Sequence, residues 1–391
     1  MIVTAAGLWN DREYIERPVV RFSDGRIVSI ATADSSGTPA ALHASVLDFP
    51  SATLAPAFFD VHIHGAAGHD LMEATPEALH AIGSFLATKG TGAYLATTVA
   101  APLDATLHAV AGLAKLIENP SLIAPERRPV ARPIGIHLEG PFLSHEKCGV
   151  QPVEHILAPD IAIFNRIFDA AEGKVRLMTI APEMPGAIEL ARHATTRGVR
   201  ISLGHSNAKA AETRAAIAAG AVSATHTFNA MRALDHHEPG ILGTVLTTES
   251  LYAELICDGI HLKPEIVQLW FKAKGPKRGI LITDAMSATG MPDGEYQLGG
   301  FAVQVANGRA TARGVLAGSV LTLDRALANF IEYTATPLED ALPLLTTNPT
   351  AMAGFESRGS LAEGQPANMV ALDEAGGLLA SIVDGQLAAR R

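Results

Sequence analysis

Six side chains of types that commonly bind metal ions follow five short, largely apolar segments of this sequence. The six are His62, His64, Glu139, His205, His226 and Asp284. His62 and His64 are two residues apart, so on a strand both side chains point to the same face. Four imidazoles and two carboxylates suit a borderline divalent ion such as Zn²⁺. The pattern therefore predicts a metal site assembled from segments far apart in the chain.

Each of these signals has an ordinary explanation when it stands alone. A His-x-His pair on a strand is commonly structural, and a single Asp or Glu after a strand commonly caps the next helix. Here five predicted strands each deliver a ligand-type residue at the same end. Such joint occurrence favours the metal site over five separate coincidences.

The elements that must position these residues alternate between strand and helix. The helical segments have recognisable ends, such as Thr75 with Pro76 at a start and Gly90 after an end. Eight alternating units predict a parallel (β/α)₈ TIM barrel, in which active sites lie at the carboxyl ends of the strands. The eight candidate strands are residues 55–64, 93–98, 133–138, 175–180, 199–203, 222–224, 252–256 and 279–283.

Both chain ends have a different character from the centre. Short β-branched segments separated by turn residues predict strands at 18–22, 26–30, 45–49, 368–372 and 380–383. We expect them to meet in one small β-sandwich domain, made of residues 1–53 with 355–391, beside a barrel domain of residues 54–354. The glycine-rich stretch 285–318 predicts an inserted hairpin, with strands at 296–298 and 302–305.

Composition excludes several classes of protein. The 391 residues include two cysteines, Cys148 and Cys257, too few for a disulfide scaffold or a thiolate-rich zinc module. A net charge of −10 argues against nucleic acid as the main partner. We find neither a membrane-spanning apolar run nor a signal peptide, so a cytoplasmic location is the default expectation.

Taken together, the motifs resemble the N-acetylglucosamine-6-phosphate deacetylases of the amidohydrolase superfamily. The resemblance spans nearly the whole chain in order, and the segments around Glu139 and after His226 are its most specific parts. The motifs are His62-x-His64, 137–141 (His-Leu-Glu-Gly-Pro), 204–206 (Gly-His-Ser), 226–231 (His-Thr-Phe-Asn-Ala-Met), 258–261 (Asp-Gly-Ile-His), 283–285 (Thr-Asp-Ala), 316–319 (Leu-Ala-Gly-Ser) and 347–349 (Thr-Asn-Pro).

The resemblance implies a metal centre and a mechanism. Glu139, His205 and His226 would hold one divalent ion, with Zn²⁺ as the first candidate and Fe²⁺ or another divalent ion as the alternative. His62 and His64 would hold a second ion, with Glu139 bridging, so one or two ions per subunit are expected. Asp284 would have two roles: it would be one of the metal ligands, and it would act first as the general base and then as the general acid. Amide hydrolysis of the acetyl group would release acetate and the free amino sugar.

The resemblance also implies a set of substrate-binding residues. The family commonly carries an Arg, contributed across a dimer, where this chain has His237, and His is a weaker, pH-dependent phosphate partner. Arg232 lies nearby in the sequence as a possible substitute. Gln151 stands in a lid-like loop where many relatives have His. We expect a homodimer and a small amino-sugar phosphate as substrate, contacted by Val150, Gln151, Asn229, Ala230, His237, His261, Leu316, Ala317 and Gly318.

Three alternatives stay open at this stage. The substrate could be another N-acetylated amino sugar, such as the galactosamine epimer or an unphosphorylated sugar. A ring-opening cyclic amidase is disfavoured, because those relatives commonly use a carboxylated Lys on the fourth strand and residues 175–182 contain none. A non-catalytic barrel would be expected to have lost ligand residues, and all six are present.

Overall fold

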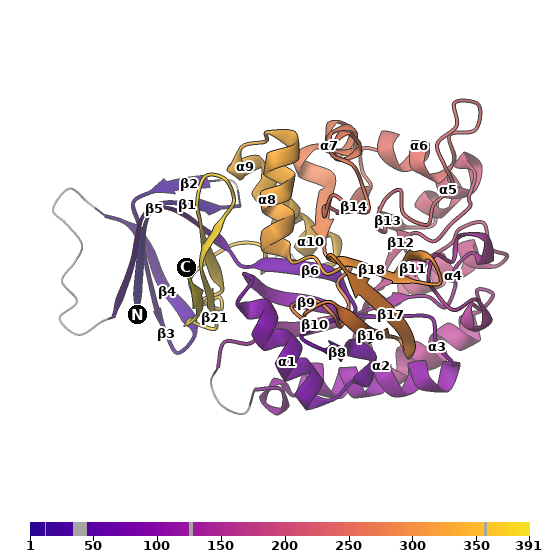
Figure 1. Ribbon diagram of the computed structural model, residues 1–391, viewed down its shortest axis with the longest axis horizontal. Helices are drawn as coiled ribbons and strands as arrows, with labels where there is room; N and C mark the ends of the chain where they lie inside the picture. The colour runs from indigo at the N-terminus through magenta and orange to yellow at the C-terminus, as the bar shows by residue number, and fades with distance from the viewer. Residues whose placement is uncertain (12, 34–44, 125–127, 356–357) are drawn as a thin grey trace.

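The computed structural model describes residues 1–11, 13–33, 45–124, 128–355 and 358–391. A sheet of eight parallel strands ringed by helices forms the larger part, and strands from both chain ends form a second sheet beside it (Figure 1). The fold class predicted from the sequence is therefore confirmed: an α/β barrel with a separate β unit built from the two termini. The exact division into domains at residues 53 and 355 stays a prediction.

The barrel strands lie in the order β15-β14-β13-β12-β11-β10-β9-β6, so each is hydrogen-bonded to its sequence neighbour. All eight predicted strands are present, although the first begins at Phe58 rather than residue 55. Each strand is followed by one of the helices α1 to α8. The strands are β6 (Phe58–Ile63), β9 (Thr91–Thr98), β10 (Arg132–Glu139), β11 (Val175–Ile180), β12 (Arg200–Leu203), β13 (Ala221–Ala224), β14 (Tyr252–Ile256) and β15 (Gly279–Ile282).

Helix ends follow the local chemistry of the sequence. The hydroxyl of Thr75 accepts from the amide of Ala78, and Pro76 occupies the first position of α1, where its missing N–H is not needed. Gly90, with φ of 82°, then turns the chain into β9. The helices are α1 (Pro76–Ala87), α2 (Leu103–Glu118), α3 (Ile161–Ala170), α4 (Ala187–Thr196), α5 (Ala210–Ala218), α6 (Gly240–Thr247), α7 (Pro264–Arg278), α8 (Leu323–Thr334), α9 (Leu338–Ala341) and α10 (Thr347–Met352).

The barrel closes between its first and last strands just beyond their carboxyl ends. The amide of Asp284 donates to the carbonyl of His62 at 2.9 Å, and the amide of His64 donates to the carbonyl of Ala285 at 2.8 Å. These two backbone bonds join segments more than two hundred residues apart. They also place three of the predicted ligand residues next to one another.

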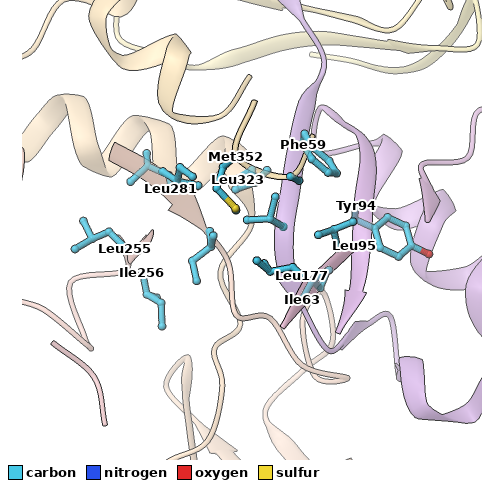
Figure 2. Packing of buried hydrophobic residues seen from close by; sticks show 14 of the residues in the cluster. Phe59, Ile63, Tyr94, Leu95, Leu177, Leu255, Ile256, Leu281, Leu323 and Met352 are labelled. Carbon is cyan, nitrogen blue, oxygen red and sulfur yellow. The ribbon is translucent and has the colours of Figure 1, made fainter. Parts of the chain in front are cut away.

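Branched apolar side chains fill the space between the strands and their covering helices. Figure 2 shows Ile63, Leu95 and Leu177 from three strands in one buried group, with Leu281 and Met352 nearby. Burial of such side chains contributes roughly 1.5–3 kcal/mol each. The barrel is therefore a packed core, and polar ligands are confined to its mouth.

The second sheet joins the two ends of the chain through one strand. β5 pairs in parallel with β1 and antiparallel with β20, up to Pro56. β1 was not among the predicted strands, because its Ala and Gly residues carry little strand propensity. The exposed ring of Tyr14 from β2 lies over Gly7, so a side chain at this position would require that ring to move. The strands are β1 (Ile2–Asn10), β2 (Glu13–Glu16), β3 (Pro18–Ser23), β4 (Arg26–Thr32), β5 (Val46–Pro56), β20 (Met369–Leu372), β21 (Leu378–Val383) and β22 (Gln386–Arg390).

The predicted hairpin at 285–318 is wrong in extent, because a four-stranded antiparallel sheet forms there instead. Positive φ at Asn307, Gly308 and Gly314 makes two further tight turns that the sequence reading did not separate. Its buried face includes Leu298 and Val303, which pack with Val99 and Ala317. The strands are β16 (Gly294–Leu298), β17 (Phe301–Ala306), β18 (Arg309–Ala312) and β19 (Val315–Leu316).

Short elements complete the chain. The pair β7 and β8 forms a two-stranded ribbon immediately after β6. Within the described residues, no helix is long and apolar enough to cross a membrane. The short elements are β7 (Gly65–Ala66), β8 (His69–Asp70), η1 (Leu71–Glu73), η2 (Pro120–Leu122), η3 (His145–Lys147), η4 (Val153–His155) and η5 (Leu342–Leu344).

Candidate active site

The structure brings all six predicted ligand residues together at the carboxyl ends of the barrel strands. All six are buried, and they form two groups in which the candidate ligand atoms lie within 4.8 Å of one another. One group comes from the two strands that close the barrel, and the other comes from β10 and from the turns after β12 and β13. The groups are His62, His64 and Asp284, and Glu139, His205 and His226.

Three of these residues leave their strands in a left-handed backbone conformation. The φ angles are 46° at His205, 26° at His226 and 50° at Asp284. Non-glycine residues rarely adopt such angles, and each instance costs on the order of 1–3 kcal/mol. Surrounding hydrogen bonds hold the turns, as where the amide of Ser144 donates to the carbonyl of His205. These turns therefore place three candidate ligands at the mouth of the barrel at a cost that the surrounding structure must offset.

Glu139 and two imidazoles form a compact triangle of ligand atoms. Oε1 of Glu139 lies 3.1 Å from Nε2 of His205 and 3.0 Å from Nε2 of His226. The two Nε2 atoms lie 3.1 Å apart. Ligands at about 2.0–2.1 Å from a tetrahedral Zn²⁺ are separated by roughly 3.3 Å, so the triangle has the size of a coordination sphere.

The second group lies against the same carboxylate. Nε2 of His62 and Nε2 of His64 are 3.3 Å apart, and Asp284 Oδ1 is 3.2 Å from Nε2 of His64. Oε1 of Glu139 faces His62 at 3.3 Å, while its Oε2 faces His64 at 3.2 Å. Glu139 therefore contacts the imidazoles of both groups, which is the geometry of a bridging ligand.

The electrostatics of the cluster favour a positive charge at its centre. Burial acts to raise the pKa of Glu139, but the charges of His62 and His205 and hydrogen bonds from the imidazoles outweigh it, and the pKa lies well below its usual range. Burial opposes the charged form of His64, yet hydrogen bonds to Asp284 and Glu139 raise its pKa to about 9. Because metal binding replaces protons on such ligands, these residues fit a divalent ion.

A loop after β10 wraps the Glu139 group. Nδ1 of His205 lies 3.0 Å from the carbonyl of Lys147, which orients the ring. Gln151 is buried; its Oε1 accepts from the amide of Ala100 at 2.8 Å, and its Nε2 donates to Oε2 of Glu139 at 2.7 Å. The amide of Gln151 is thus directed at a ligand residue, and its predicted contact with substrate stays a prediction.

The other predicted substrate residues lie around this centre in different degrees of exposure. Asn229 and Ala230 are half-buried and lie three and four residues after His226, and a side-chain carbon on Gly149 of the loop would touch both His205 and Ala230. His261 is held by Asp258, whose Oδ2 lies 2.7 Å from Nδ1.

The inserted sheet approaches Asp284 from the other side. Ala317 is fully buried, Val150 and Leu316 are half-buried, and a side-chain carbon on Gly318 would lie 2.9 Å from the Asp284 carbonyl. The amide of Ser319 donates to that same carbonyl at 2.7 Å.

His237 lies apart from the residues described so far. It is exposed, its amide is capped by the carboxylate of Asp235 at 2.8 Å, and its ring lies against that of His236 at 3.9 Å between centroids. Within the described residues it makes no hydrogen bond, ion pair or ring contact with either ligand group. The structure of this chain therefore leaves its predicted phosphate contact untested.

Three buried ionisable residues of the site, Asp60, His137 and Glu254, were given no role in the sequence analysis. Asp60 accepts from the hydroxyl of Thr283 at 2.6 Å, and burial raises its pKa to about 7. The ring of His137 packs edge-on against that of His62, and its Nε2 lies 2.8 Å from the hydroxyl of Thr179. Glu254 is fully buried beside His62.

Two of these residues had a recognisable signal in the sequence. Asp60 continues the alternation that includes His62 and His64, and Glu254 is a charge inside an otherwise apolar strand. A charge in such a place requires a partner.

Comparison with known proteins defines the class to which this fold and site belong. An amidohydrolase family model matches residues 53–388, and the chain belongs to the amidohydrolase family. The N-acetylgalactosamine-6-phosphate deacetylase of Escherichia coli O157:H7 is 36% identical, over 99% of each chain. The N-acetylglucosamine-6-phosphate deacetylase of Bacillus subtilis is 33% identical, over 99% of this chain and 97% of its own.

A solved structure supports the same conclusion. The N-acetyl-D-glucosamine-6-phosphate deacetylase of Mycobacterium smegmatis superposes with a TM-score of 0.90 at 33% identity, covering 100% of this chain and 99% of its own. The family resemblance drawn from the sequence motifs is confirmed.

Metal binding should stabilise the folded chain measurably. After removal of metal by a chelator, Zn²⁺ at 100 times its dissociation constant should raise the free energy of unfolding by about 2.7 kcal/mol per site. Thermal unfolding with and without the ion is the measurement. His205→Ala should lose most of this gain, whereas His108→Ala, which removes an exposed imidazole from α2, should retain it. Equal gains in the two variants would contradict the site.

Proposed function

We propose that this chain is a metal-dependent deacetylase that hydrolyses N-acetyl-D-glucosamine 6-phosphate to D-glucosamine 6-phosphate and acetate, in the breakdown and recycling of amino sugars. The observation that carries the proposal is the pair of ligand groups that meet at Glu139 at the mouth of the barrel. Full-length similarity to deacetylases of hexosamine phosphates supports the same substrate class. The reaction is hydrolysis of a linear amide bond.

The assignment of ligands follows the two groups. Glu139, His205 and His226 would hold one ion, and His62, His64 and Asp284 would hold a second, with Glu139 in contact with both. Zn²⁺ is the first candidate, because imidazole and carboxylate ligands at these separations suit it. When bound, such an ion supplies Lewis acidity, which makes water a nucleophile near neutral pH and polarises the amide carbonyl.

Asp284 is the residue best placed to move protons. Its side chain is 12% exposed, whereas those of the other five ligand residues are between 0% and 6% exposed. Burial acts to raise the pKa of Asp284, but the hydrogen bond from His64 and the nearby imidazole charges lower it below its usual value. Asp284 is therefore ionised at neutral pH and can accept a proton from the attacking water.

Asp284 then returns that proton to the sugar nitrogen. An amine anion is a very poor leaving group, so the C–N bond breaks only as the nitrogen is protonated. The left-handed turn at Asp284 and its backbone bond to His62 keep the carboxylate fixed over the cluster during both transfers.

The sugar would be held by the loops around the cluster. Asn229, Ala230 and His261 come from the turns after β13 and β14. Val150 and Gln151 come from the loop after β10, and the segment 316–318 comes from the end of the inserted sheet. Contributions from so many loops suit a ligand with hydroxyl groups on every side.

The phosphate partner is the least conventional part of this proposal. A cavity of about 450 Å³ beside the Glu139 group is lined by Arg232, Lys209 and His145 together with three glutamates. Nη1 of Arg232 is 3.3 Å from the carbonyl of Asn207, which orients the guanidinium. We propose Arg232 as the phosphate donor within one subunit, with His237 contributing from the exposed rim across a homodimer. A cytoplasmic location fits such a sugar-phosphate enzyme.

The galactosamine epimer is the second candidate substrate. The 36% identical relative from Escherichia coli O157:H7 acts on N-acetylgalactosamine 6-phosphate by name, and the two sugars differ only in the orientation of one hydroxyl group. The metal centre and Asp284 would treat the two acetamido groups alike. The choice between them would therefore rest on the loops.

The substrate assignment is tested by acetate release from metal-loaded protein. We expect the highest kcat/KM with N-acetylglucosamine 6-phosphate, a lower value with the galactosamine epimer, and a much lower value with unphosphorylated N-acetylglucosamine. A charge-assisted phosphate contact of about 1.5–3 kcal/mol corresponds to a preference of roughly 10- to 150-fold. A preference for the epimer would retain the mechanism and change the substrate. No acetate from any of the three sugars would refute the proposed activity.

Replacement of Asp284 by Asn tests the proton-transfer role. The amide keeps the shape of the side chain but cannot accept a proton, so kcat should fall by about 10²- to 10⁴-fold. The ion held by Glu139, His205 and His226 should stay, as measured by elemental analysis of the purified variant. Retention of wild-type turnover would remove Asp284 from the mechanism.

Replacement of His237 by Arg tests the phosphate contact at the rim. A permanently charged, bidentate donor should lower KM for the phosphorylated sugar several-fold and leave KM for the plain sugar unchanged. Steady-state kinetics on both sugars provide the measurement. His236→Arg is a matched control on the adjacent exposed residue, and an equal effect from it would show a general charge effect instead.

A further inference from the structure

Glu254 is a fully buried carboxylate in the centre of β14, directly behind the candidate metal centre. Its Oε2 lies 3.4 Å from Nδ1 of His62, and its Oε1 has no hydrogen-bond partner within the described residues. Across the same described part of the chain, His62 is the one ion-pair partner of Glu254. A carboxylate buried this deeply costs several kcal/mol unless it is paired, so its contact with His62 requires an explanation.

The contact is made with the outward nitrogen of His62. The other nitrogen, Nε2, faces the cluster, at 3.3 Å from both His64 Nε2 and Glu139 Oε1. A neutral imidazole carries its proton on one nitrogen and a lone pair on the other. An acceptor at Nδ1 holds the proton there, so the lone pair on Nε2 is directed into the cluster.

The other three imidazoles of the centre lack this arrangement. Nδ1 of His205 faces a backbone carbonyl, that of Lys147, at 3.0 Å. Nδ1 of His64 and Nδ1 of His226 are buried without a hydrogen-bond partner in the described structure. Among the four imidazoles, His62 is therefore the one whose Nδ1 faces a carboxylate within the described residues.

A purely structural role in the sheet does not account for the carboxylate. β13 and β14 are already joined through the main chain, where the amide of Thr227 donates to the carbonyl of Glu254 at 2.8 Å. The amide of His226 lies 3.4 Å from Oε2 of Glu254, the same distance as Nδ1 of His62, so this oxygen lies between a main-chain amide and the ring of one candidate ligand. An apolar side chain of the same size would preserve the sheet.

We propose that Glu254 is a positioning residue for a second divalent ion: it fixes the tautomer and the ring orientation of His62, so that His62, His64 and Asp284 hold that ion beside the first, with Glu139 in contact with both. The inference rests on the proposed metal centre and deepens it. It implies that this chain binds two ions, and that the two sites differ in the residues behind the ligands: one site has a ligand imidazole supported by a carboxylate, and the other does not. Removal of the Glu254 carboxylate should therefore lower the affinity for the ion held by His62 and leave the affinity for the other ion unchanged.

The test is the binding of Zn²⁺ to the whole, metal-free chain, titrated against a chromophoric chelator without any sugar present. The wild type should bind two ions, confirmed by elemental analysis. Glu254→Leu removes the hydrogen-bond acceptor at similar side-chain volume. It should lower the affinity for one of the two ions by about 10- to 100-fold. Glu254→Gln keeps a neutral acceptor, so its affinity for that ion should lie between those of the wild type and Glu254→Leu. This variant keeps the test valid if the leucine variant does not fold.

Asn348→Ala is the control for general destabilisation. Nδ2 of Asn348 donates to the carbonyls of Pro276 and Gly279 at the opposite end of β15, so its loss should lower thermal stability without changing either affinity. Equal loss of both ions in the Glu254 variants, or the same pattern in Asn348→Ala, would overturn the inference.

Two further outcomes also decide the matter. A wild-type chain that holds one ion, or Glu254 variants with unchanged affinities, would overturn the inference. Two ions bound as expected, by a protein that releases no acetate, would refute the proposed function alone, because the titration contains no sugar.

Discussion

The arrangement of the barrel mouth depends on one buried carboxylate, Glu139, which is surrounded by imidazoles. Glu139 lies 3.0–3.3 Å from the Nε2 atoms of four histidines that come from three different barrel strands or the turns after them. Like-facing nitrogens at such distances repel one another unless protons or cations lie between them, and the carboxylate loses its hydration on burial. A rigid barrel holds each contributor from behind, and divalent cations bound between these groups would satisfy the carboxylate and the imidazole nitrogens together.

The barrel meets this requirement through its closure. Two backbone hydrogen bonds join the segment 62–64 to the segment 284–285, so His62, His64 and Asp284 become neighbours although they are far apart in sequence. Left-handed turns at His205, His226 and Asp284 occur where the strands end. Strain of this kind is tolerated only where surrounding packing over-determines the backbone, and the fully buried core below the mouth provides that packing. The free energy gained by packing the barrel core thus offsets the backbone strain of the three turns at its mouth.

Sequence reasoning recovered the parts of this design that follow a local rule. Period-two alternation identified His62 with His64, and the repeat of strand and helix identified the barrel. It missed what depends on tertiary contact. β1 is a strand because β3 and β5 pair with it, and its own residues have weak strand propensity. The pairing of Glu254 with His62 joins positions 192 residues apart, so the local sequence around either residue does not indicate which residue it contacts. The inserted sheet was underestimated because two of its turns lie within one glycine-rich stretch.

Division of labour between strands and loops explains how one metal centre can serve related sugars. The candidate metal ligands come from strand ends, whose positions are fixed by the barrel, whereas the surfaces proposed to contact a sugar come from the loop 148–151, the turn after His226 and the end of the inserted sheet. These parts are not independent of the chemistry. The amide of Ser319, which follows that sheet, donates to the carbonyl of Asp284, and Gln151 of the loop donates to Glu139. If the proposed sugar site is correct, a sugar held by this loop and this sheet would lie against segments that are hydrogen-bonded to Asp284 and Glu139, so substrate recognition would be coupled to the positions of the two proposed reactive carboxylates.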